Sequence, residues 1–188
     1  MATLRLFIAF DTPPEIRPGI VATRDRLKQS HADVKWEPDG KLHCTVKFLG
    51  DTEEQKVPDI ISNIERICLG TKPFKVIYRG LGCFPSFRDP RVVWVGIANP
   101  GDELHDLAKR IELAMAPLGF EPEHREFHPH VTLGRVKGRK NLSGLLTMLE
   151  TVTFEGQPVT IPSLEIVKSE LKTSGSEYSI VRSILFSK

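Results

Sequence analysis

The stretch LHCTVKFLG, residues 42–50, sets the pattern from which the fold can be worked out. Polar and apolar side chains alternate along it, and a period of two residues is typical of a β-strand with one buried face. His43, Thr45 and Lys47 share the face that is expected to point away from the core. The face expected to pack against the core carries four apolar side chains: Leu42, Cys44, Val46 and Phe48.

A second stretch of the same kind, FHPHVTLGR, covers residues 127–135. It places His130 and Thr132 on one face of a predicted strand and Val131 and Leu133 on the other. Two His-x-Thr matches 87 residues apart are weak evidence by themselves, because so short a motif arises easily by chance. The shared strand context strengthens them, so we expect two similar strands that present two imidazoles and two hydroxyls.

The composition around these stretches is that of a globular chain. With 188 residues, 40% hydrophobic and 27% charged, it excludes a disordered protein. No run of 18 apolar residues occurs, and the N-terminal stretch reaches Asp11 too early for a signal peptide, so we expect a cytoplasmic protein without a membrane segment. Three cysteines without metal-finger spacing argue against a disulfide framework. A net charge of +2 neither requires nor excludes an anionic partner.

Apolar periodicity and turn residues predict the remaining elements. Besides the strand at 42–48, strands are predicted at residues 4–10, 34–36, 74–81, 91–97, 128–136, 152–154, 164–171 and 178–186. A loop is predicted at 82–90, and helices at 14–29, 57–68, 104–115 and 141–149. This order lacks strict β-α-β alternation, which favours an α+β fold with mainly antiparallel sheets.

The order of elements also contains a weak repeat. A helix, a strand with His-x-Thr and a second helix occur around residues 14–67 and again around 102–149. We therefore expect two similar lobes that face each other across a groove. No linker-like segment separates them, so residues 1–188 are predicted to form one domain of two interleaved lobes.

Two histidines and two threonines that converge in this way suit displacement at phosphorus. Such a reaction needs a base for the attacking water, an acid for the departing alkoxide, and donors for the non-bridging oxygens. Histidine titrates near pH 6.5, so one ring can be neutral while the other is protonated. A threonine hydroxyl can donate to a phosphate oxygen, and its branched side chain is stiff on a strand.

Both stretches, together with FIAFD (7–11), CFPSFRDPRVVWVGI (83–97), VKSEL (167–171) and EYSIV (177–181), resemble the two-histidine phosphoesterases. Within that superfamily they resemble the RNA 2′,3′-cyclic phosphodiesterases, also called 2′-5′ RNA ligases. The resemblance covers nearly the whole chain and implies a bilobal fold of two antiparallel sheets around a central groove, with helices outside. It implies hydrolysis of RNA 2′,3′-cyclic phosphates to 2′-phosphomonoesters without a metal or other cofactor, with 2′-5′ joining of tRNA halves as a side activity.

The resemblance assigns roles to five residues of this chain. His43 would protonate the O3′ leaving group and His130 would activate water, while Thr45, Thr132 and Arg135 would hold the phosphate. Which imidazole is acid and which is base stays open, because the sequence does not show which ring is protonated. The implied partner is an RNA with a cyclic phosphate end, with tRNA halves as candidates, and a monomer is favoured.

Some residues near the motifs have more than one interpretation. Strict alternation from His130 places Arg135 on the backing face, but a glycine within a strand often marks a bulge, and Gly134 could re-aim it. Phe48 could stack on a base, although its predicted face favours core packing. Lys47 and His128 could add positive charge at the groove edge.

Three further features have plainer explanations beside the functional ones. His124, His128 and His130 could suggest a metal cluster, but no cysteine or well-spaced carboxylate completes a site. The basic segment Arg135, Lys137, Arg139 and Lys140 could follow an RNA backbone or be a solvated face, as could Arg88 and Arg91. Trp94 is predicted to lie in the core.

Two other functions stay open at this point. One is a module that binds RNA ends without turnover, and the other is a phosphodiesterase that acts on small cyclic-phosphate nucleotides.

Overall fold

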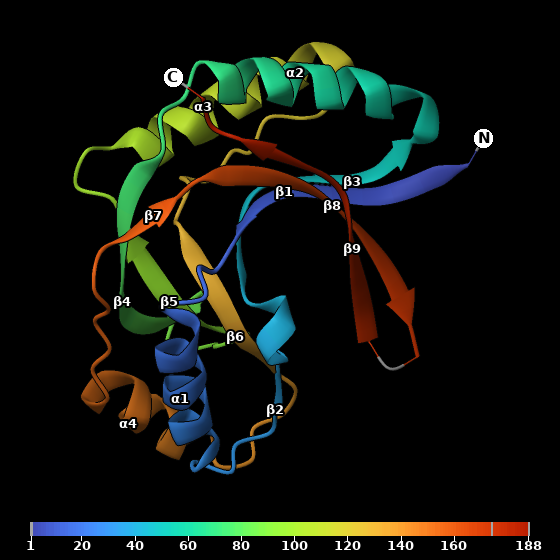
Figure 1. Cartoon of the computed structure of the whole chain (residues 1–188). Helices are drawn as coiled ribbons and strands as arrows, with labels where there is room; N and C mark the ends of the chain where they lie inside the picture. The colour runs from blue at the N-terminus through green and yellow to red at the C-terminus, as the bar shows by residue number, and fades with distance from the viewer. Residues whose placement is uncertain (1, 174, 188) are drawn as a thin grey trace.

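Two antiparallel sheets form the framework of the computed structural model, which describes residues 2–173 and 175–187 (Figure 1). The first sheet has the strand order β3-β1-β8-β9 and contains β1 (Thr3–Asp11), β3 (His43–Glu53), β8 (Ser163–Lys172) and β9 (Gly175–Leu185). The second has the order β2-β6-β5-β4-β7 and contains β2 (Val34–Trp36), β4 (Phe74–Phe84), β5 (Val92–Ala98), β6 (His130–Val136) and β7 (Val159–Ile161). All strand pairs described are antiparallel, so the predicted α+β class is confirmed.

Four helices cover the outside of the sheets (Figure 1). Helices α2 (Val57–Leu69) and α3 (Glu103–Met115) pack on each other and on strands of the first sheet. Helices α1 (Arg17–Lys28) and α4 (Leu142–Thr151) pack together beside the second sheet, where α4 contacts β4. Short 3₁₀ turns occur at η1 (Asp39–Lys41), η2 (Glu54–Lys56) and η3 (Ala116–Leu118). Among the described helices, none has the length and apolar character that crossing a bilayer requires.

The two sheets share one apolar core. A single cluster of buried side chains contains Ile8 from β1, Val95 from β5, Val131 from β6 and Leu107 from α3. Strands β3 and β6 belong to different sheets but contact each other. The sheets therefore meet along the two strands that carry the His-x-Thr motifs. The chain's three cysteines are buried free thiols within this framework.

Two of the predicted segments are wrong, for local reasons. Residues 152–154 are irregular rather than a strand, because Val152 closes the end of α4 and Phe154 packs against Gly19 of α1. Strand β7 has no counterpart among the predicted strands, since its three residues stand between prolines at 158 and 162. Residues 82–84 extend β4 rather than starting the predicted loop, so that loop is shorter.

Candidate active site

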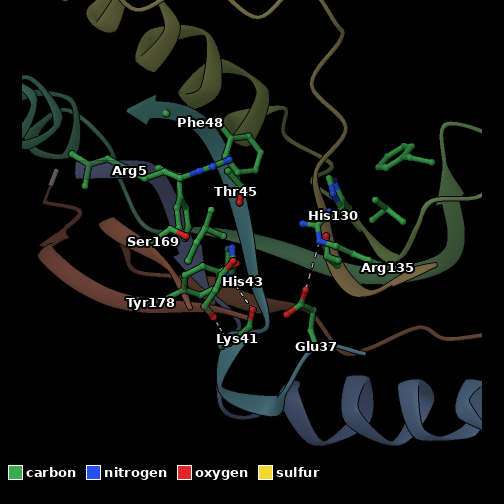
Figure 2. A pocket seen from close by; sticks show the side chains of 18 residues that line it. Arg5, Glu37, Lys41, His43, Thr45, Phe48, His130, Arg135, Ser169 and Tyr178 are labelled. Atoms are coloured by element: carbon green, nitrogen blue, oxygen red, sulfur yellow. Dashed lines mark hydrogen bonds and ion pairs between the residues drawn. The ribbon is translucent and has the colours of Figure 1, made fainter. Parts of the chain in front are cut away.

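One cavity of about 400 Å³ lies where the two sheets meet (Figure 2). His43 and Thr45 reach it from β3, and His130 and Thr132 reach it from β6. Arg135, near the end of β6, lines the same cavity. The fold thus brings together all five residues that the sequence singled out.

The two histidines are held by the same backbone interaction. The Nδ1 of His43 lies 2.7 Å from the carbonyl oxygen of Lys41, and the Nδ1 of His130 lies 2.7 Å from that of His128. A carbonyl oxygen only accepts, so Nδ1 donates in both rings and Nε2 is left for proton exchange. In each case the carbonyl belongs to the residue two positions earlier in the chain, so the two halves of the site repeat one local design.

Aromatic rings surround both imidazoles. His43 stacks on Phe7, with ring centroids 5.0 Å apart, and meets Tyr178 edge-on at 5.3 Å. His130 meets Phe84 edge-on at 4.9 Å. These rings restrict rotation of the imidazoles and remove water from them. Trp94 was predicted to be core, but it is half-buried on this side of its sheet, beside Phe84 and His130.

Burial lowers the pKa of both imidazoles, but the nearby charges differ. At His43, the carbonyl of Lys41 and the carboxylate of Asp11 oppose this effect on the pKa, whereas the charges of His130 and Arg135 add to it. At His130, the carbonyl of His128 opposes it, whereas the charges of His128 and Arg135 lower the pKa further. The carboxylate of Asp11 therefore offsets part of the lowering of the pKa at His43, and none of the described carboxylates does so at His130.

A β-bulge in β3 changes the predicted alternation after Thr45. Thr45 pairs with Ala9 and Lys47 with Ile8 on the neighbouring strand, so Val46 is an extra residue. As a result Lys47 is buried, with 5% of its surface exposed, and Phe48 is 69% exposed and lines the cavity. The predictions that Phe48 packs in the core and that Lys47 charges the groove edge are both wrong.

The buried Lys47 instead joins three segments of the chain. Its Nζ donates to Glu112 of α3 at 2.6 Å and to the carbonyl oxygen of Glu121 at 3.0 Å. The backbone N–H of Glu123 donates to the same Glu112 carboxylate at 3.3 Å. This ion pair therefore ties the segment that leads into His130 to the strand that carries His43.

A matching bulge occurs in β6. Thr132 pairs with Trp94 and Gly134 with Val93, so Leu133 is the extra residue and Arg135 turns toward the cavity. The bulge suggested by Gly134 is present. A Cβ at this glycine would lie 2.7 Å from Val34, which explains the absence of a side chain. Phe48 and Arg135 each follow their histidine by five residues and occupy equivalent places in the two motifs.

Further residues outside the two motifs line the cavity, among them Arg5, Glu37, Lys41, Ser169 and Tyr178. Glu37 lies 3.8 Å from the Nε of Arg135, and the ammonium of Lys41 lies 5.4 Å from the centre of the Tyr178 ring. Three of these residues, Arg5, Ser169 and Tyr178, come from strands far from the motifs in sequence. Lys41, two residues before His43, and Ser169 and Tyr178, within the VKSEL and EYSIV strings, carried a local signal, whereas Arg5 and Glu37 carried none.

Several of the other basic residues lie away from this cavity. Lys137, Arg139 and Lys140 follow β6 and are not among its lining residues, and Arg88 is not either. Arg91 lines a neighbouring cavity of about 1000 Å³, together with His128, and pairs with Asp89 at 2.9 Å. Within the part of the chain that the structure describes, no three His, Cys, Asp or Glu side chains are grouped to hold a metal ion.

The two motifs provide two proton-exchanging nitrogens, two hydroxyl donors and one guanidinium around a single cavity. Cys44, which lies between His43 and Thr45, points into the core, where burial raises the pKa of its thiol to about 12. The thiol is therefore neutral and turned away from the cavity. This set of groups fits acid–base chemistry on a phosphate ester.

Comparisons with known proteins agree with this geometry. Residues 12–173 match the model of the 2′-5′ RNA ligase superfamily. A protein of Methanothermobacter thermautotrophicus named RNA 2′,3′-cyclic phosphodiesterase is 34% identical, covering 94% of this chain and 95% of its own length. One of the same name from Aquifex aeolicus is 33% identical, covering 96% of each chain.

Solved structures share the fold. The crystal structure of TT0787 of Thermus thermophilus matches with a TM-score of 0.84 and 27% identity, over 97% of this chain and 98% of that one. Escherichia coli LigT complexed with 3′-AMP matches with a TM-score of 0.78 and 23% identity over the whole of both chains, a likeness of fold alone.

Proposed function

This chain belongs to the 2′-5′ RNA ligase superfamily, and on that basis we propose that it hydrolyses RNA 2′,3′-cyclic phosphate ends to 2′-phosphomonoesters. The observation that carries the proposal is the convergence of His43 and His130 on one cavity, each with Nε2 available for proton exchange. Relatives that match nearly the whole chain are named for this activity.

The two imidazoles supply the proton transfers. Nε2 of His130 accepts a proton from water as the water oxygen forms a bond to phosphorus. The bond between phosphorus and O3′ breaks, and the protonated Nε2 of His43 gives its proton to O3′. The products are a 3′-hydroxyl and a 2′-phosphomonoester, and each well-placed proton transfer contributes about 10² to 10⁴ in rate.

The charges near the histidines support this division of roles. Asp11 favours the protonated form of His43, which a general acid must have at the start of the reaction. Burial, with the neighbouring charge of Arg135, lowers the pKa of His130 and favours its neutral form, which a general base must have. In the ligation direction, a 5′-hydroxyl takes the place of water.

Thr45, Thr132 and Arg135 hold the phosphate. Their hydroxyl and guanidinium groups donate to the non-bridging oxygens, where negative charge increases in the transition state. Strand alternation from each histidine places both threonines on the cavity side, and the bulge in β6 turns Arg135 to the same side. The exposed ring of Phe48 offers a surface on which the terminal base stacks.

The wider setting follows from this activity. The substrate is an RNA with a cyclic phosphate end, which includes tRNA halves, in the cytoplasm. The two lobes act as one catalytic domain, and every group of the site comes from one chain, so a monomer is sufficient.

The direct test uses purified protein, EDTA and an oligoribonucleotide that ends in a 2′,3′-cyclic phosphate. We expect a new phosphomonoester that is identified as the 2′ isomer by chromatography against 2′- and 3′-phosphate standards. Tight binding with unchanged RNA would instead support a binding module. Turnover of 2′,3′-cyclic AMP without turnover of the oligonucleotide would indicate a nucleotide phosphodiesterase, and activity that returns only with added metal would refute the mechanism.

A further inference from the structure

The cavity has two different ends on either side of the histidine pair. Figure 2 shows Arg5 and Phe48 on one side of His43, and Lys41 and Glu37 on the opposite side. An RNA whose terminal phosphate lies between the histidines must leave the cavity past one of these ends. The contacts at each end indicate which of the two ends the RNA passes.

At the Lys41 end, the hairpin of β8 and β9 contacts the other half of the molecule. The Nζ of Lys41 in η1 donates to the carbonyl oxygen of Ser176 in β9. A Cβ placed on Gly175 would lie 2.7 Å from the Nζ of Lys35 in β2, so the hairpin also reaches the second sheet. These contacts close this end of the cavity to a continuing chain.

At the opposite end, Arg5 is exposed and lines the cavity. Within residues 2–173 and 175–187, the structure gives its guanidinium no hydrogen bond and no ion pair, although Asp51 stands opposite it in the β1–β3 register. Arg135, by contrast, forms an ion pair with Glu37 and is proposed to hold the terminal phosphate. Arg5 is therefore a positively charged residue of the cavity that takes no part in the proposed proton transfers or in holding the terminal phosphate.

The register of the first sheet places a hydroxyl beside Arg5. Leu6 pairs with Lys168, so Arg5 lines up with Ser169 on β8, and Ser169 pairs with Tyr178 on β9. Both Arg5 and Ser169 line the cavity. Arg5 also stands two residues before Phe7, about 7 Å along the strand from the ring that stacks on His43.

On the basis of the proposed function, we propose that Arg5 and Ser169 bind the phosphodiester immediately 5′ of the terminal nucleotide, so that the RNA leaves past Arg5. A guanidinium and a hydroxyl suit the two non-bridging oxygens of a phosphodiester. The terminal nucleoside then lies over Phe7 and Phe48, between the two phosphates. A mononucleotide 2′,3′-cyclic phosphate has no such phosphodiester, so this subsite gives the enzyme its preference for RNA ends.

The test compares kcat/KM for 2′,3′-cyclic AMP with that for the dinucleotide ApA 2′,3′-cyclic phosphate. With Arg5→Gln, we expect the loss on the dinucleotide to exceed the loss on the mononucleotide by about tenfold, mostly in KM, as for a hydrogen bond to a charged group. Arg26→Gln, at an exposed arginine on α1, is the matched control and should affect both substrates alike.

A third substrate lacks the negative charge of the internal phosphodiester, so it tests the same contact from the RNA side. With a methylphosphonate in place of the internal phosphodiester, the wild-type protein should lose about the same tenfold, and Arg5→Gln should lose nothing more. Equal effects of Arg5→Gln on all three substrates would overturn the subsite while leaving the phosphodiesterase intact. A wild-type protein inactive on both cyclic phosphates would overturn the proposed function, and the subsite with it.

Discussion

At the scale of single residues, the site depends on two histidines that share a tautomer but differ in their charged neighbours. Both donate from Nδ1 to the carbonyl of the residue two positions earlier, which fixes the ring and leaves Nε2 for proton exchange. The carboxylate of Asp11 acts on His43, whereas the positive charge of Arg135 acts on both rings. We therefore propose His43 as the acid, for an electrostatic reason that a single substitution can test.

Asp11→Asn should move one limb of the pH profile. Loss of the carboxylate removes an interaction that raises the pKa of His43, so this pKa should fall further. The alkaline limb of kcat/KM reports the proton donor of the free enzyme, so it should move to lower pH. Asp59→Asn, at an exposed aspartate on α2, serves as the control. Movement of the acidic limb instead would make His43 the base.

At the scale of elements, two β-bulges decide which side chains reach the cavity. The period-two pattern was sufficient to predict both strands and to place His43, Thr45, His130 and Thr132 on their inner faces. In β6, Gly134 also indicated the bulge that turns Arg135 inward. No such residue marks the bulge in β3, so hydropathy could not show that the chain buries a lysine and exposes a phenylalanine there. Burial of Lys47 depends on Glu112, a partner 65 residues away.

Gly134→Ala should disturb this arrangement. The added Cβ would lie 2.7 Å from Val34, 2.9 Å from Trp36 and 3.2 Å from the carbonyl of Lys35, so β2 and β6 must separate. We expect the free energy of unfolding to fall by about 1–3 kcal/mol, as for other overpacked sites, and kcat/KM to fall because Arg135 moves. Urea denaturation and steady-state kinetics measure the two effects.

Gly144→Ala on α4 is the matched control, since a Cβ there meets no atom within 4 Å. In a helix interior this change should stabilise the protein by about 0.5–1 kcal/mol without changing activity. Equal stability of Gly134→Ala and the wild type would contradict the account of the β6 bulge.

At the scale of the whole molecule, the site exists because β3 and β6, from different sheets, lie in contact. The element order and the α+β class could be predicted from local pattern. The strand orders β3-β1-β8-β9 and β2-β6-β5-β4-β7 could not, because they depend on pairings between segments far apart in the chain. For the same reason Arg5, Ser169 and Tyr178, from three strands of one sheet, could not be seen as one wall of the cavity.

Burial of the two imidazoles should make stability depend on pH. In the folded protein the pKa of His43 and of His130 lies below the unfolded value near 6.5, so below that pH the unfolded chain binds more protons. Their contribution is fully present above pH 6.5 and is lost as the pH falls toward the folded values. Between pH 7 and pH 5, the free energy of unfolding of the wild type should fall more than that of the double variant His43→Gln, His130→Gln.

Urea denaturation at both pH values measures this difference. Glu165, whose pKa burial raises, acts in the opposite direction but is present in both proteins, so its effect largely cancels in the comparison. Parallel losses of stability would show that burial does not lower the pKa of the two imidazoles.

The most direct test of the central claim is the initial rate of hydrolysis of a 2′,3′-cyclic phosphate oligoribonucleotide, in EDTA, by the wild type, His43→Ala and His130→Ala. The account predicts a 2′-phosphomonoester product and a loss of at least about 100-fold in each variant, with thermal unfolding showing that both variants are folded. Near-full activity in either folded variant, or an inactive wild type, would contradict it.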